Sequence, residues 1–548
     1  MAGKRRSSLI SNGILLGASI VVTALLFGTL EGVLRLAGLG EPDASRTSRL
    51  KYQQIYFPTL IPDARPDGTE VLRTDDKRLP FQEILREKPA NGYRVFTFGG
   101  SATAGLGYAP TVSFAHHLRQ MLEAALPESH VEVVNLGIVA LASKQVALLV
   151  DEAATHFDAD ALVVYSGNNE FLEVHAQKYA DAHATPISRA RELLAETHLY
   201  RFVNQAIRGG PDTPSLAEQD FSQEDLRLTQ AAIIEDVKME PAEIDAVVDR
   251  YAANIAAMQT SAEANDVPLL LMTVASNWEW RGRSDLPESW IDDLLGSVAP
   301  ATPERLLEAR RRVSEELEKA PANERYEWLY KRAELSAQLG DWGAARADYR
   351  AHMNEDPHLR RALDRMGDRV VAVAKAGAAR AIDITAEFSQ TTPNGIVGFE
   401  EFYDYVHFTP RGATRAGVLV FEALRDAGWL PEETDFAPQA YLQGEAARIA
   451  ASGADAFGLD AWLGIGFDSA NLSDRDLWKY DRMVKDLDQR LEANPQDLDA
   501  LVYRGNAHYF EVDGHERAAA LYERARDLAP ENADIAENLD RVRSEARP

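Results

Sequence analysis

The chain has 548 residues, 45% of them hydrophobic and 26% charged, which is the composition of a folded protein with more than one core. A formal net charge of −28 leaves no basic surplus for phosphate groups and argues against a nucleic-acid partner. Cysteine is absent, which excludes disulfides, a thiolate nucleophile and cysteine-ligated zinc.

An uncharged, apolar run from Leu9 to Leu30 follows basic residues at positions 4 to 6. As a helix, such a run is long enough to cross about 30 Å of hydrocarbon. Basic residues before the run predict a cytoplasmic N-terminus. We therefore expect a single-pass anchor in the inner (cytoplasmic) membrane, with the rest of the chain periplasmic or extracellular. A cleaved signal peptide is the alternative, but no clear small-x-small cleavage site follows the run.

Beyond a segment rich in Pro, Asp and Arg, short apolar runs alternate with amphipathic periodicity. Runs of this kind, each followed by a helix, predict a parallel sheet covered by helices on both faces. In such sheets ligands bind at the carboxyl ends of the strands. The predicted strands are 93–98, 131–136, 161–165, 267–274 and 381–384, and the predicted helices between them include 112–126, 145–156 and 243–264.

Polar or glycine residues follow three of these strands directly, and an acid and a histidine lie close together further on. Ser101 comes after Gly99-Gly100, and Asp404 and His407 are three residues apart in a predicted turn. A serine hydroxyl becomes nucleophilic when an imidazole takes its proton and a carboxylate orients that imidazole. The pattern therefore predicts Ser101 as nucleophile, His407 as base and Asp404 as its orienting group.

An acyl-transfer site also needs donors for the developing oxyanion. The candidates are the backbone N–H groups of Ser101 and Gly137 and the side-chain amide of Asn168, each just after a predicted strand. Glycine at position 137 permits close approach of the backbone. Because position 103 is threonine, the G-x-S-x-G elbow of α/β-hydrolases is absent.

The four blocks, Gly99-Gly100-Ser101, Asn135-Leu136-Gly137, Gly167-Asn168-Asn169-Glu170 and Asp404-Tyr405-Val406-His407, resemble those of the SGNH hydrolases, the superfamily of GDSL esterases and lipases. The resemblance implies a flavodoxin-like three-layer α/β/α domain with the site roles given above. Gly-Gly-Ser-Ala here replaces the family's common Gly-Asp-Ser-Leu, and Gly-Asn-Asn-Glu replaces Gly-x-Asn-Asp. Such variants are similar to the family's acyltransferase-like side.

Two further regions have helical periodicity with tetratricopeptide-like spacing, and simple antiparallel helical hairpins are the alternative. A groove between such helices suits a protein partner. The residues with this spacing are Ala333, Ala345, Tyr349 and Pro357 in one region, and Ala518, Tyr522, Ala525 and Pro530 in the other.

The predicted divisions are an anchor (1–38), a linker (39–90), a catalytic domain in two parts (91–299, with an acidic insert near 185–235, and 366–436), a helical insertion (300–365) and a C-terminal helical domain (437–548).

Trp278 and Arg281 follow the strand predicted at 267–274, so they point toward the same edge of the sheet as Ser101. They either line a substrate cleft or lie buried under the helical insertion. The sequence contains no metal-ligand spacing, phosphate-binding Gly-Lys pair or dinucleotide fingerprint, so no cofactor or metal is expected.

The sequence thus predicts a membrane-anchored serine ester hydrolase that cleaves an acyl or acetyl ester, glycan- or lipid-linked, through an acyl-enzyme on Ser101. One alternative keeps the site but transfers the acyl group to a hydroxyl of a cell-surface glycan. The other is an inactive scaffold whose C-terminal helices recruit a protein partner.

Overall fold

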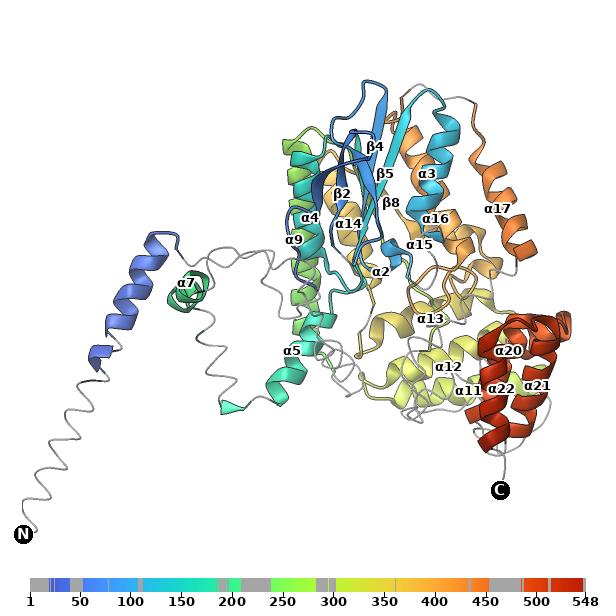
Figure 1. Ribbon diagram of the computed structural model, residues 1–548. Coiled ribbons are helices and arrows are strands. Elements are labelled where there is room, and N and C mark those ends of the chain that lie inside the picture. The colour runs from blue at the N-terminus through green and yellow to red at the C-terminus, as the bar shows by residue number, and fades with distance from the viewer. Residues whose placement is uncertain are drawn as a thin grey trace, which may run out of the picture. The chain divides into compact units, whose positions relative to one another are not determined.

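The computed structural model describes residues 19–39, 53–106, 112–183, 185–186, 194, 197–207, 238–281, 294, 302–431, 435–452, 484, 487–510 and 514–545, except 20, 24, 77 and 360 (Figure 1). The chain divides into two compact units. The first holds residues 1–63, 72–81 and 171–237, and the second holds residues 64–71, 82–170 and 238–548.

A five-stranded parallel sheet of order β5-β4-β6-β7-β8 lies in the second unit and confirms the predicted sheet. Gly99 pairs with both Gly137 and Tyr165, so the carboxyl ends of the three neighbouring strands are level. The strands are β4 (Gly92–Gly99), β5 (His130–Gly137), β6 (Ala161–Tyr165), β7 (Leu269–Met272) and β8 (Arg380–Ile382).

Helices cover both faces of this sheet, as expected for an α/β fold (Figure 1). On one face, α3 (Phe114–Ala125) packs against α16 (Pro410–Asp426), and their apolar residues share a core with Val95, Val163 and Leu270 of the sheet. On the other face lie α4 (Ser143–His156), α9 (Pro241–Ala264) and α14 (Asp364–Ala376).

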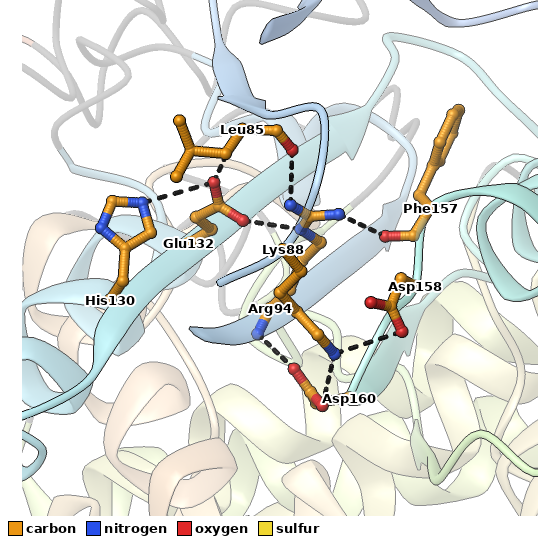
Figure 2. Close-up of polar contacts among 8 residues, drawn as sticks. All are labelled: Leu85, Lys88, Arg94, His130, Glu132, Phe157, Asp158 and Asp160. Atoms are coloured by element: carbon orange, nitrogen blue, oxygen red, sulfur yellow. Dashed lines mark hydrogen bonds and ion pairs between the residues drawn. The ribbon is translucent and has the colours of Figure 1, made fainter. Parts of the chain in front are cut away.

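A buried ion pair stabilises the sheet near the amino-terminal end of β4 (Figure 2). Arg94 is 1% exposed and donates to Glu132 Oε2 at 2.6 Å and to the carbonyl oxygens of Phe157 and Leu85, each at 2.7 Å. Its backbone N–H donates to Asp160. The contacts of Arg94 join β4 to β5, to Leu85 and to the end of α4, so its role is structural.

In the regions predicted as helical, 300–365 and the C-terminal region, the described residues form helices joined by short turns. In the first, α11 (Pro303–Lys319) contacts α12 (Arg325–Gln338), which contacts α13 (Trp342–Glu355). In the second, α20 (Leu498–Phe510) contacts α21 (His515–Leu528), which contacts α22 (Ala533–Glu545). Their tetratricopeptide character stays a prediction.

The remaining elements are not strands of this sheet. Much of the acidic insert predicted at 185–235 lies outside the described residues. Three of the remaining elements form a second sheet in the order β1 (Leu60–Ala64), β2 (Glu70–Thr74) and β3 (Glu83–Leu85). The others are α2 (Ser101–Ala104), α5 (Leu172–Ala182), α7 (His198–Ile207), α15 (Ile384–Thr391), a 3₁₀ turn at Pro393–Gly395 and α17 (Pro438–Ser452).

The predicted membrane anchor is wrong. Among the residues that the structure describes, no helix has the length and apolar character needed to cross a bilayer. Residues 9–18, 20 and 24 of the predicted run lie outside the described residues. In the helix that follows, Glu31 pairs with Arg35 at 3.0 Å and accepts the backbone N–H groups of His198 and Leu199 at the start of α7. Two further predictions depended on this anchor, a cytoplasmic N-terminus and a periplasmic or extracellular catalytic domain. They are therefore not retained.

Candidate active site

Two glycines bring the end of β4 into position for Ser101, the first residue of α2. A Cβ on Gly99 would lie 2.1 Å from the carbonyl oxygen of Tyr165, and one on Gly100 would lie 2.3 Å from Nδ2 of Asn169. At Gly99 the clash is with the backbone, so that position requires glycine, whereas a side chain at Gly100 would require the Asn169 amide to move. The amide of Asn169 thus occupies the space in which the aspartate of a Gly-Asp-Ser-Leu block would begin.

The structure brings Ser101, His407 and Asp404 together in one hydrogen-bonded chain. Nε2 of His407 lies 2.6 Å from Oγ of Ser101, and Nδ1 lies 2.6 Å from Oδ2 of Asp404. All three residues are at most 8% exposed. Because the carboxylate can only accept, Nδ1 carries the proton and Nε2 is left to accept from the serine hydroxyl.

The second oxygen of Asp404 organises the turn on which the pair lies. Oδ1 accepts the backbone N–H groups of Val406 and His407 at 2.8 and 2.7 Å. The turn is closed by a bond from Tyr403 N–H to the His407 carbonyl oxygen at 3.0 Å. Asp404 therefore holds the backbone with one oxygen and the imidazole with the other.

A buried ion pair supports the base of this turn. Glu401 is fully buried and pairs with Arg415 of α16, whose guanidinium lies over the Phe388 ring at 4.9 Å. Burial raises the pKa of Glu401 to about 7, against the opposing charge of Arg415. The Glu401 carbonyl oxygen accepts Thr409 N–H at 2.9 Å, which joins the two ends of the turn. Sequence analysis did not find this pair.

The predicted oxyanion donors occupy different environments. Ser101 N–H is at the first position of α2, where no intrahelical acceptor exists. The N–H of Gly137 donates to Oδ1 of Asn135 at 2.9 Å, so it already has an acceptor within the chain. A Cβ on Gly137 would lie 2.4 Å from Ala104 N, which shows how closely β5 approaches α2. Oδ1 of Asn168 accepts Ala362 N–H at 3.3 Å.

Asn169 lies beside the predicted oxyanion donor Asn168 and was not among the predicted site residues. Its Nδ2 donates to the Leu141 carbonyl oxygen at 2.9 Å and lies against Gly100, next to the nucleophile. A side-chain amide has two N–H donors, so one remains for a ligand. The signal was present in the sequence, because Asn168 and Asn169 are adjacent within the same block.

Trp278 and Arg281 are buried against the helical insertion. Trp278 is 3% exposed and Arg350 of α13 lies over its ring at 5.5 Å. Arg281 is 4% exposed, lies 5.3 Å from the Tyr330 ring centroid and pairs with Glu334 of α12 at 3.5 Å. This is the burial that the sequence left open as the alternative to a substrate cleft.

No family model matches the chain, and none of the curated proteins matches it. Among solved structures, the crystal structure of LAE5, an alpha/beta hydrolase enzyme from the metagenome of Lake Arreo, Spain, is similar at 11% sequence identity and a TM-score of 0.27. The match covers 63% of this chain and 99% of that one.

Proposed function

We propose that the chain is a serine ester hydrolase of the SGNH type, acting on an acyl or acetyl ester through an acyl-enzyme on Ser101. The observation that carries this proposal is the continuous chain from Ser101 Oγ through both nitrogens of His407 to Asp404. A nucleophile, a base and an orienting carboxylate in mutual contact are the geometric requirement for activating a serine.

In the first half-reaction Ser101 Oγ attacks the ester carbonyl carbon while His407 Nε2 takes the hydroxyl proton. The tetrahedral oxyanion collapses, the C–O bond to the alcohol breaks, and His407 returns the proton to the leaving oxygen. Water then attacks the acyl carbon while His407 takes its proton, the bond from the acyl carbon to Ser101 Oγ breaks, and His407 returns the proton to Oγ as the free acid leaves. Asp404 stays ionised and stabilises the imidazolium in both steps.

We assign the amide donor of the oxyanion hole to Asn169, beside the nucleophile, with Ser101 N–H as its partner. Asn168, the residue favoured by the sequence, accepts Ala362 N–H at its amide oxygen, which leaves its Nδ2 donors available and makes it the alternative donor. Gly137 N–H takes part only by sharing its hydrogen between Asn135 and the oxyanion.

The full chain is expected to react covalently with a fluorophosphonate probe at Ser101. Ser101→Ala removes the nucleophile and His407→Ala removes the base, so both variants should lose the label. Ser129→Ala, in the turn between α3 and β5, is the matched serine control and should label like the wild type. An unlabelled wild-type protein with a cooperative thermal unfolding transition would contradict the proposed function.

Replacing Asn169 with alanine should lower kcat by about 10²- to 10³-fold with little change in KM, the usual cost of one oxyanion donor. Asn168→Ala serves as the neighbouring control and should cost clearly less. Steady-state hydrolysis of a chromogenic acetyl ester measures both variants. A larger loss of kcat in Asn168→Ala returns the donor role to Asn168.

A further inference from the structure

Asn277, just beyond the end of β7, is completely buried and holds the turn that bears the catalytic acid and base. Its Nδ2 donates to the Asp404 carbonyl oxygen at 2.9 Å, and its N–H donates to the Tyr405 carbonyl oxygen at 3.0 Å. Oδ1 accepts Glu279 N–H at 3.0 Å, which fixes the amide in this orientation. One side chain and its own backbone therefore hold two consecutive residues of the turn.

Arg361 in turn holds Asn277. It lies between α13 and α14, is 4% exposed, and donates from Nη1 to the Asn277 carbonyl oxygen at 2.8 Å. Burial lowers the pKa of Arg361 to about 10, which leaves the guanidinium charged at neutral pH. A hydrogen bond from a charged donor is stronger than a neutral one.

We propose that Asn277 and Arg361 are positioning residues, through which the segment between α13 and α14 holds Asp404 against His407. The inference rests on the proposed function, because it assigns a support to that same site. The orientation of the Asp404 and His407 side chains depends on the backbone of a short turn. Small displacements of a reacting group lower the reaction rate by orders of magnitude. Groups that orient the residues in direct contact with a reaction centre have comparable effects.

The adjacent residue, Ala362, gives this segment a second attachment near the site. Its N–H donates to Asn168 Oδ1 at 3.3 Å. Two consecutive residues after α13 thus reach the turn of Asp404, through Asn277, and the loop that follows β6. The segment that follows α13, the last of the three helices α11 to α13, therefore contacts residues of the site.

The first test does not depend on activity. The bond between His407 Nδ1–H and Asp404 should give a low-field proton resonance in the full chain, assigned by its loss in Asp404→Asn. Asn277→Ala should shift or broaden this resonance. Arg332→Met is the matched control, because it breaks the Arg332 pair with Asp348 between α12 and α13 without touching Asn277. An unchanged resonance in Asn277→Ala overturns the proposal.

The second test is kinetic and separates positioning from folding. Asn277→Ala and Arg361→Met should each lower kcat about 10- to 100-fold with KM nearly constant, while Arg332→Met lowers thermal stability but not kcat. Arg361→Lys keeps a charged donor and should recover part of the loss. A kcat within twofold of wild type in Asn277→Ala, or equal losses in Arg361→Lys and Arg361→Met, overturns the proposal. Hydrolysis that survives in Ser101→Ala overturns the proposed function instead, and the resonance still decides the positioning role.

Discussion

Asp404→Asn is expected to lower kcat by about 10⁴-fold while the protein stays folded. The reason lies in how the two oxygens of Asp404 are used. Oδ1 accepts two backbone N–H groups, from Val406 and His407, so the amide oxygen of an asparagine must remain on that side. The amide NH₂ then replaces Oδ2 and faces Nδ1 of His407. Nδ1 must accept, the ring proton moves to Nε2, and Nε2 can no longer take the proton of Ser101.

Single-turnover and steady-state hydrolysis of an activated acetyl ester measure this loss, and thermal unfolding verifies the fold. Asp383→Asn is the matched control, since Asp383 accepts Ala386 N–H at the start of α15 and asparagine caps a helix equally well. The control should keep both kcat and stability. A loss smaller than tenfold in Asp404→Asn would remove Asp404 from the catalytic group.

The parallel sheet and the edge at which Ser101 lies were predictable, because both depend on local pattern. Residues of β4 and β6 are almost all buried, as their mainly apolar sequences indicate, and the pairing of Gly99 with Gly137 and Tyr165 makes the strand ends level. Asn277 and Arg361 were not predictable. Their bonds join residues 127 and 84 positions apart, and an isolated asparagine or arginine has no periodic signal.

The N-terminal prediction was overturned because, among the residues that the structure describes, no helix has the length and apolar character needed to cross a bilayer. The sequence pattern also did not predict the contact between Glu31 and His198, which lies 167 residues further along the chain. A hydropathy window is much shorter than that separation. The choice between Asn168 and Asn169 stays a prediction, because the two residues share one motif and differ in structure by the position of Asn169 Nδ2 against Gly100.

Arg94→Met should lower the free energy of unfolding of the second unit, which holds the five-stranded sheet, by about 3–5 kcal/mol, the usual cost of breaking a buried ion pair. Methionine keeps the apolar stem but removes the guanidinium from Glu132, whose side chain is 7% exposed and keeps only the Leu85 N–H at 2.7 Å and His130 at 3.5 Å. The carbonyl oxygens of Leu85 and Phe157 also lose their donor (Figure 2). An unsatisfied buried acceptor costs more than a hydrogen bond contributes.

Urea unfolding followed by tryptophan fluorescence measures this change. Arg86→Met is the matched control, because the Arg86–Glu70 pair has the same chemistry at 52% and 66% exposure and should contribute less than about 1 kcal/mol. Arg94→Met combined with Glu132→Met should recover part of the loss, since it removes the unpaired charge along with its partner. Equal effects of Arg94→Met and Arg86→Met would contradict the structural role of Arg94. Arg94 lies near the start of β4, whereas Ser101 follows the end of the same strand. We therefore expect the folded fraction of Arg94→Met to keep the kcat of the wild type. One end of β4 then affects stability and the other end affects catalysis.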